Sequence, residues 1–205
     1  MNEEPFTIIH IGKCGGSSVS TILNKHNIQR HKIHVAKPNF HSNRKYVIVI
    51  RNPIQRFISA FNWRYKLVVL EKSQENKFAG EKALLTKYAS VNNLAENISE
   101  FNIHKNYIHH IKEDIFFHIG KFLEKCTKEN ILGIITTENL LEEVNQLFGL
   151  QENIHAKNNT TVKDKYISDV GYKNLKNYLK KDYDCIDKLF AMGCLTQEQY
   201  NVLSK

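Results

Sequence analysis

The segment from residue 7 to residue 18 constrains the fold more than any other part of the chain. TIIHI (7–11) is an apolar, β-branched run that stops at a glycine, as a buried strand does. GKCGGSS (12–18), the glycine loop, follows at once. Ser17 or Ser18 can cap a helix with apolar residues at 19, 22 and 23. A strand, a loop and a helix in this order form half of a βαβ unit, which predicts a parallel sheet.

YVIVI (46–50) is the strongest strand signal in the chain. It is apolar on both faces, which is typical of a parallel strand covered by helices. The strand ends at Arg51-Asn52-Pro53, and Pro53 suits the first turn of a helix. The apolar residues of that helix recur at helical spacing: Ile54, Phe57, Ile58, Phe61, Tyr65 and Val68.

The other elements follow from similar patterns. Strands are expected at 33–35 and 131–136, one or two helices within 72–103, a long helix over 105–125, a helix from 138, and two or three helices after 166. Strands that alternate with helices predict an α/β fold with a central, mainly parallel sheet flanked by helices and a helical C-terminal part. A chain of 205 residues fits a single domain over residues 1–205.

The charge balance favours a polyanionic partner. The chain has 29 Lys and Arg against 21 Asp and Glu, a net charge of +8, although a lysine-rich composition alone would give the same excess. Its four cysteines form no C-x-x-C pair and no disulfide framework. No apolar stretch approaches the ~20 residues of a membrane span, and the acidic start lacks the pattern of a signal peptide. We therefore expect a cytoplasmic protein, unless the chain is a trimmed luminal domain.

The glycine loop has the chemistry of a phosphate site. Glycines let backbone N–H groups turn toward an anion, and the next helix directs its positive end at the same point. Lys13 adds a full charge, and Ser17 and Ser18 add hydroxyl donors. The pattern is not a Walker A loop, because its lysine precedes the glycine pair. The alternative is a tight turn with a solvated lysine.

A second phosphate contact is expected where the 46–50 strand ends. Arg51 lies at the carboxyl end of that strand, where ligands bind in open α/β sheets. An arginine fork suits bidentate capture of a phosphate. Ser59, two turns into the following helix, can donate to the same group.

Together these two motifs resemble those of a known family. HIGKCGGSS resembles the 5′-phosphosulfate loop of sulfotransferases that use 3′-phosphoadenosine 5′-phosphosulfate (PAPS), a loop usually close to H-I-P-K-T-G-G-T-S. YVIVIRNPIQRFISAF is similar to their 3′-phosphate motif, a strand followed by R-D-P-x-x-R-x-x-S-x-Y. The order and spacing of the two motifs agree with the family, and the match is closest to the glycan branch, which includes heparan sulfate 2-O-sulfotransferase and short bacterial relatives.

The resemblance implies a P-loop-like three-layer fold and an enzyme that transfers the sulfuryl group of PAPS to an acceptor hydroxyl. The acceptor would belong to a glycan or glycolipid, the product would be 3′-phosphoadenosine 5′-phosphate (PAP), and neither metal nor nucleic acid is implied. A basic segment at IHAKNNTTVKDKY would close over the donor. The implied donor-binding residues are Lys13, Cys14, Gly15, Gly16, Ser17, Ser18, Arg51, Ser59, Lys157, Thr160 and Thr161. The chain departs from the family pattern at Gly12, Cys14, Asn52 and Phe61, which replace proline, threonine, aspartate and tyrosine.

Two residues carry the implied catalysis. Lys13 would neutralise charge on the leaving group. His34, in HKIHV, resembles the second histidine of an H-x-H-V stretch whose second histidine is the proposed base, with Lys32 in place of the first. The alternative bases are glutamates of the middle region and His31, His41, His109 and His110. The last two are expected to point apart on a helix, where they could not share a metal.

Three alternatives compete with this interpretation. A P-loop kinase would need Mg²⁺ ligands, yet the sequence offers neither a Walker A serine or threonine nor an evident acidic strand end. A basic nucleic-acid-binding module would interleave aromatic residues with its cations, which this chain does not do. A sulfotransferase fold without activity would not need Lys13 and Arg51. Trp63, Arg64 and Lys66 either face an acidic acceptor or are a packed ring and two solvated cations.

Overall fold

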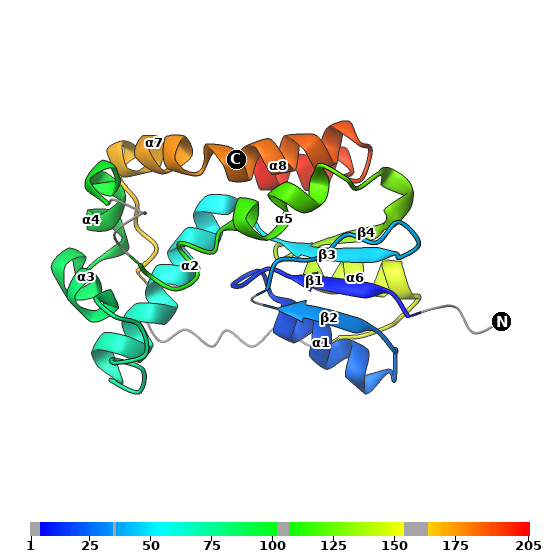
Figure 1. The fold of residues 1–205 in the computed structure, drawn as a ribbon, viewed down its shortest axis with the longest axis horizontal. Helices are drawn as coiled ribbons and strands as arrows, with labels where there is room; N and C mark the ends of the chain where they lie inside the picture. Colours follow the sequence, from blue (N-terminus) through cyan, green and yellow to red (C-terminus); the bar gives the residue numbers. More distant parts are fainter. Residues whose placement is uncertain (1–4, 35, 102–106, 154–163) are drawn as a thin grey trace.

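The computed structural model describes residues 5–34, 36–101, 107–153 and 164–205, and it has an α/β architecture (Figure 1). In these ranges one sheet has four strands, all parallel, in the order β2-β1-β3-β4. The strands are β1 Thr7–His10, β2 His31–His34, β3 Tyr46–Ile50 and β4 Ile131–Thr136. The predicted parallel sheet is confirmed.

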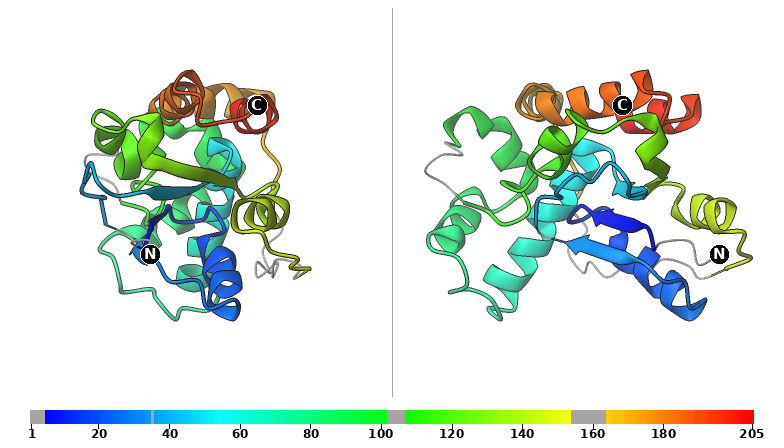
Figure 2. Two further views of the ribbon diagram at one scale, coloured as in Figure 1. Left: turned by 90° about the vertical axis from the view of Figure 1, so that its right-hand side faces the viewer. Right: turned by 45° about the vertical axis from the view of Figure 1, so that its right-hand side comes forward.

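Helices cover both faces of the sheet. Figures 1 and 2 show α5 (Ile115–Leu123) and α8 (Lys180–Ala191) over one face, and α1 (Gly16–Lys25) and α6 (Leu140–Phe148) against the other. β1 and β3 are buried at every position, which explains their continuous apolar sequences. The edge strand β2 is largely exposed and correspondingly polar. α9 (Gln197–Ser204) packs on α8, and a short 3-10 turn, Lys128–Asn130, precedes β4.

A second group of helices lies beyond the carboxyl edge of the sheet. α2 (Pro53–Tyr65) leaves that edge and continues as a π-helix, Lys66–Leu70 (Figure 1). Its apolar stripe packs in a hydrophobic cluster of its own, separate from the cluster around the sheet. The other helices of this group are α3 Glu81–Tyr88, α4 Val91–Glu96, the 3-10 turn Ile98–Glu100 and α7 Asp169–Tyr178.

The predicted helix over 105–125 is wrong in its first half. Residues 107–114, the histidine segment, are not helical, and α5 begins only at Ile115. Asp114 caps α5, since its carboxylate accepts a hydrogen bond of 2.6 Å from the Phe117 N–H. His110 has a φ of 66°, which no α-helix allows.

The start of α1 also differs from the expectation. Neither Ser17 nor Ser18 caps the helix. Gly15 is the N-cap, with a left-handed φ of 82° that a side chain would disfavour. Both serines therefore lie inside the first turn.

The topology brings the two sequence motifs together. After β1 the chain crosses to β2 on one side, and it then returns to place β3 on the other side of β1. The carboxyl ends of β1 and β3 thus flank a topological switch point, where open α/β sheets form a crevice for ligands. The glycine loop follows β1 and Arg51 follows β3. In the described ranges no helix has the length and apolarity to cross a bilayer.

Candidate functional site

The glycine loop has the backbone of an anion site. Lys13 adopts a left-handed φ of 70°, uncommon for a residue with a side chain, and Gly15 follows at 82°. The Cys14 N–H closes a turn by donating to the Ile11 carbonyl at 3.2 Å. At the start of α1 the Ser18 and Val19 N–H groups donate to the Gly15 carbonyl at 2.9 and 3.2 Å, which leaves the N–H groups of Gly16 and Ser17 for a ligand.

Lys13 is a half-buried cation close to Arg51. Burial, and next the positive charge of Arg51, lower the pKa of Lys13 to about 8. Its Nζ lies 4.4 Å from the ring centroid of Trp63 on α2. Among the described residues no carboxylate forms an ion pair with it. An anion bound here would supply the counter-charge that Lys13 lacks.

Arg51 is only loosely paired. Its Nε lies 3.8 Å from a carboxylate oxygen of Glu138, beyond hydrogen-bond distance, and this buried Nε has no hydrogen-bond partner in the described ranges. Glu138 follows β4, so the expectation that no acidic residue follows a later strand is wrong. Burial raises the pKa of Glu138. The structure therefore puts two cations and one carboxylate at the switch point.

Ser59 and Trp63 share one face of α2, four residues apart. Ser59 is half-buried, and Trp63 carries the Lys13 ammonium on its ring. Trp63 is thus neither a plain core residue nor a free surface residue. The structure brings Ser59 to the same face of α2 that Lys13 touches.

Asn52, which departs from the family pattern, has a structural role. Its side-chain oxygen caps α2 by accepting from the Gln55 N–H at 3.0 Å. Its amide donates to the carbonyls of Leu203 and Lys205 at 3.1 and 2.9 Å. An aspartate could not make those two donations, so asparagine here ties the C-terminal helix to the site.

Two glycines of the loop make room for histidine rings. A Cβ on Gly12 would lie 2.5 Å from Nδ1 of His110, and one on Gly16 would lie 2.1 Å from the ring of His10. Proline, frequent in the family at position 12, would not fit under His110. Glycine at this position therefore leaves room for the His110 ring against the loop, one residue before Lys13.

His10 and His34 stack at the carboxyl ends of neighbouring strands. Their ring centroids are 4.0 Å apart, and Nδ1 of His34 lies 3.2 Å from the His10 carbonyl oxygen. Burial, and next the charge of His34, lower the pKa of His10 to about 3. His118 on α5 is also buried, and burial lowers its pKa to about 4. His10 and His118 are therefore neutral near pH 7, while His34 is exposed.

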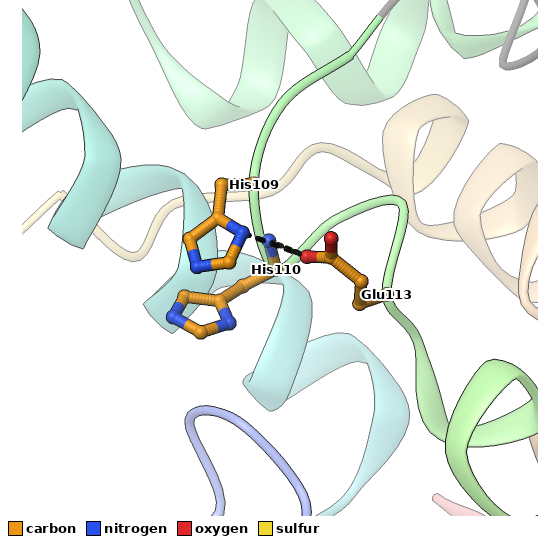
Figure 3. A group of neighbouring side chains, drawn as sticks. All are labelled: His109, His110 and Glu113. Atoms are coloured by element: carbon orange, nitrogen blue, oxygen red, sulfur yellow. Dashed lines mark hydrogen bonds and ion pairs between the residues drawn. The ribbon is translucent and has the colours of Figure 1, made fainter. Parts of the chain in front are cut away.

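His109, His110 and Glu113 form a compact group (Figure 3). His109 Nδ1 lies 2.8 Å from one Glu113 carboxylate oxygen, which also accepts the His110 N–H at 2.9 Å. The two imidazole rings lie 3.9 Å apart, so the expectation that they point apart on a helix is wrong. Burial lowers the pKa of His110 to about 2. Although burial alone would raise the pKa of Glu113, hydrogen bonds from His109, Tyr107 and the His110 N–H lower it to about 2.

One potential ligand atom from each residue of this group lies within 4.8 Å of the others, close enough for a shared metal ion. The His109 nitrogen and the Glu113 carboxylate already bond each other in the structure. Hydrogen bonding among the three therefore satisfies the group without a metal.

Two buried arginines, Arg56 and Arg64, form hydrogen bonds to segments around the site. Arg56 donates to the Glu113 carbonyl, and its charge affects the pKa values of Lys13, Cys14, His110 and His118. Arg64, 1 % exposed, makes two bonds to Glu81 of 2.6 and 2.9 Å. Arg64 is thus neither an acceptor contact nor a solvated cation, contrary to both expectations.

Several predicted donor residues are not placed at the site surface. The Cys14 thiol is fully buried and faces the Gly12 carbonyl at 3.8 Å, and burial raises its pKa to about 12. It therefore stays a neutral core thiol. Lys157, Thr160 and Thr161 lie outside the described residues.

Sequence reasoning missed three residues at the site: Arg56, His10 and His118. Arg56 stands in the Arg51 motif, and His10 lies two residues before the glycine loop.

The chain matches no protein-family model, no curated protein and no solved structure with which it was compared. Its motifs and the geometry of the switch point are therefore the basis for assigning a function.

Proposed function

We propose that this chain is a PAPS-dependent sulfotransferase with a P-loop-like fold, which transfers a sulfuryl group to a hydroxyl of a saccharide. One observation carries the proposal. Lys13 and Arg51, from two separate motifs, lie close enough at the switch point that the charge of Arg51 lowers the pKa of Lys13. Lys13 has no carboxylate partner among the described residues, and the Glu138 carboxylate lies 3.8 Å from Arg51 Nε, a loose pairing that a bound phosphate could replace.

The donor set fits the two ends of an adenosine bisphosphate. The glycine loop and Lys13 would hold the 5′-phosphosulfate, because the loop leads directly into the positive N-terminal end of α1 and Lys13 adds a full charge to the same loop. Arg51 and Ser59 would hold the 3′-phosphate. The buried Nε of Arg51, which has no hydrogen-bond partner in the described ranges, is the donor that such a phosphate would satisfy.

Sulfuryl transfer is an in-line displacement in which negative charge grows on the leaving phosphate oxygen. Lys13 would neutralise that charge, helped by the N–H groups at the start of α1. Such preorganised donors each contribute about 10²–10³ in rate. Arg51 anchors the remote phosphate, and this binding energy serves to orient the reacting end.

His34 is the base that the contacts favour. A carbonyl oxygen can only accept, so the 3.2 Å contact with the His10 carbonyl fixes the hydrogen of His34 on Nδ1. Nε2 then carries the free lone pair that takes the proton of the acceptor hydroxyl. The side chain is exposed, so an acceptor can reach it.

A magnesium-dependent kinase remains the second candidate because Glu138 lies at the switch point. Against it, Glu138 lies 3.8 Å from Arg51, and Lys13 precedes the glycine pair instead of following it. A kinase would need a carboxylate free for the metal.

The two candidates separate in one titration. Trp63 is the single tryptophan, and Lys13 lies against its ring, so its fluorescence reports ligand binding at the loop. We expect PAP to change the emission at micromolar concentration in EDTA and ATP to have no effect at the same concentration. A response only to ATP with Mg²⁺ would reject the sulfotransferase in favour of the kinase.

A further inference from the structure

We propose that His10 is a positioning residue, whose ring orients the base His34 and holds it beside the glycine loop. This inference rests on the proposed function, since it adds a residue to the same reaction. His10 ends β1 and His34 ends β2, and the two are paired in the register of these parallel strands. Their side chains therefore leave the sheet on the same face, next to each other.

The His10 ring packs against the glycine loop. A Cβ on Gly16 would lie 2.1 Å from Cδ2 and 2.5 Å from Nε2 of this ring, so only a glycine lets the two approach so closely. His10 is 5 % exposed, and its ring centroid lies 4.0 Å from that of His34, with 20° between the ring planes. One imidazole thus touches both the loop that would hold the donor and the side chain that would take the proton.

His10 restrains His34 in two ways. Its backbone carbonyl lies 3.2 Å from Nδ1 of His34, and its ring lies nearly parallel to the His34 ring. A hydrogen bond alone still lets an exposed ring turn toward water, whereas a flat surface at stacking distance restricts that rotation. The free lone pair on Nε2 of His34 is therefore held in one direction, and a fixed direction of this kind speeds proton transfer.

His10 stays neutral while His34 gains and loses its proton. Burial, and next the charge of His34, lower the pKa of His10 to about 3. The other charged groups that face it come from β2, α5 and the loop, and they act in the same direction: Lys32, His118 and Lys13. A neutral ring can lie against the imidazolium that His34 becomes, whereas a second positive ring would repel it. His10 therefore supports the protonated base and does not compete for its proton.

The flat ring of His10, and not its nitrogens, makes the contacts that matter. The buried Nδ1 of His10 has no hydrogen-bond partner in the described ranges. A buried nitrogen without a partner does not add to stability, so stacking and packing hold the ring in place. Phenylalanine at position 10 should preserve the orientation of His34, because it also presents a flat face. Leucine fills the space without such a face and should not preserve it.

The first test reads the tautomer of His34 by NMR in the ligand-free protein. Long-range proton–nitrogen spectra at about pH 8, where ordinary histidines are neutral, show which imidazole nitrogen carries the hydrogen. His34→Ala identifies the His34 signals. We expect the hydrogen on Nδ1 in the wild-type protein and in His10→Phe, and mainly on Nε2 in His10→Leu, as in free histidine.

His31 is exposed on the same strand, so His31→Leu is the matched control and should give the wild-type tautomer of His34. Three results would overturn the proposal: an Nε2 hydrogen in the wild-type protein, an Nδ1 hydrogen kept in His10→Leu, or its loss in His10→Phe.

The second test asks whether His10 acts on the reaction through His34. Water can replace the acceptor hydroxyl, so the release of labelled sulfate from PAPS measures transfer to water, which yields PAP, sulfate and a proton. We expect His10→Leu to lower this rate about tenfold with PAP affinity within about twofold, and His10→Phe to stay within about threefold of the wild type. In the His34→Ala background His10→Leu should cause no further loss. Equal losses in both backgrounds would show that His10 does not act through His34.

These measurements separate the inference from the proposed function. If PAP changes the Trp63 emission but His10→Leu keeps the wild-type tautomer of His34, only the inference about His10 fails. If PAP does not bind, the proposed function fails, and the spectra still decide whether the His10 ring orients His34.

Discussion

The glycine loop and the histidine segment meet where the His110 ring lies on Gly12, yet they are held in opposite ways. The loop carries a half-buried lysine with no ion-pair partner among the described residues, and no side chain caps the helix that follows it. In the histidine segment, Glu113 satisfies His109, Tyr107 and the His110 N–H at once. The loop therefore has the features of an anion-binding site, whereas hydrogen bonds in the histidine segment fix the positions of the His109 and His110 rings. Substitutions in the loop should mainly weaken ligand binding, and substitutions in the histidine segment should mainly lower the stability of the fold.

The largest effect is expected at Lys13. Lys13→Ala should lower sulfuryl transfer by at least about 10³, because the charge that faces the leaving group is lost, with little change in the melting temperature. Radiolabelled PAPS and a thermal melt measure the two quantities. Lys66→Ala is the matched control, since Lys66 also lies near the Trp63 ring, at 6.0 Å, but pairs with Glu71. An equal loss of activity in both variants would mean that Lys13 has no special role.

His34 should have the next largest effect. His34→Ala should lower kcat about 10²-fold and leave PAP affinity within about twofold, because a base acts on the acceptor and not on the donor. His110→Ala should instead mainly lower the stability of the fold, with a smaller effect on kcat than His34→Ala has. Steady-state kinetics and PAP titrations on both variants give the result. If His110→Ala were the more damaging to kcat, His110 and not His34 would be the base.

Gly12→Ala tests the contact between the two regions. The new methyl would lie 2.5 Å from Nδ1 of His110, so we expect destabilisation by about 1–3 kcal/mol in urea unfolding. In the His110→Ala background the same Gly12→Ala change should cost much less stability, because no ring remains for the methyl to meet. Additive losses would show that the ring does not rest on the glycine.

The smallest effect concerns pH. The pKa of Lys13 is lowered to about 8, so the ammonium loses its proton as pH rises through that value. An anion binds the charged form, and PAP affinity should therefore fall between pH 7.5 and 9.5, by up to about tenfold per pH unit above the pKa. Lys13→Arg keeps its charge over this range and should abolish the fall. A fall of the same size in Lys13→Arg would assign the titration to another group.

The same contrast explains what could be predicted from sequence. β1, the glycine loop and α1 follow from local residue types, because a β-branched run, glycines and an apolar stripe specify them without distant partners. The strand before Arg51 and the helix after Pro53 are predictable for the same reason.

The histidine segment could not be predicted in this way. Its apolar spacing suits a helix, but the Glu113 carboxylate accepts a hydrogen bond from the His110 N–H. Asp114 caps α5, so that helix begins only at Ile115. The His109 N–H donates to Glu81, which belongs to the buried pair with Arg64. Tertiary contacts thus override the local pattern. The proximity of Lys13 to Arg51 was predictable only because both end parallel strands at one switch point.

Calorimetric binding of three nucleotides tests the central claim most directly: PAP, adenosine 5′-phosphate and adenosine 3′-phosphate. Arg51→Ala should remove the preference of the protein for PAP over adenosine 5′-phosphate, because no arginine remains to bind the 3′-phosphate. Lys13→Ala should remove its preference for PAP over adenosine 3′-phosphate. If each variant weakens all three nucleotides equally, or if the wild-type protein binds none of them, Lys13 and Arg51 do not hold opposite ends of one nucleotide.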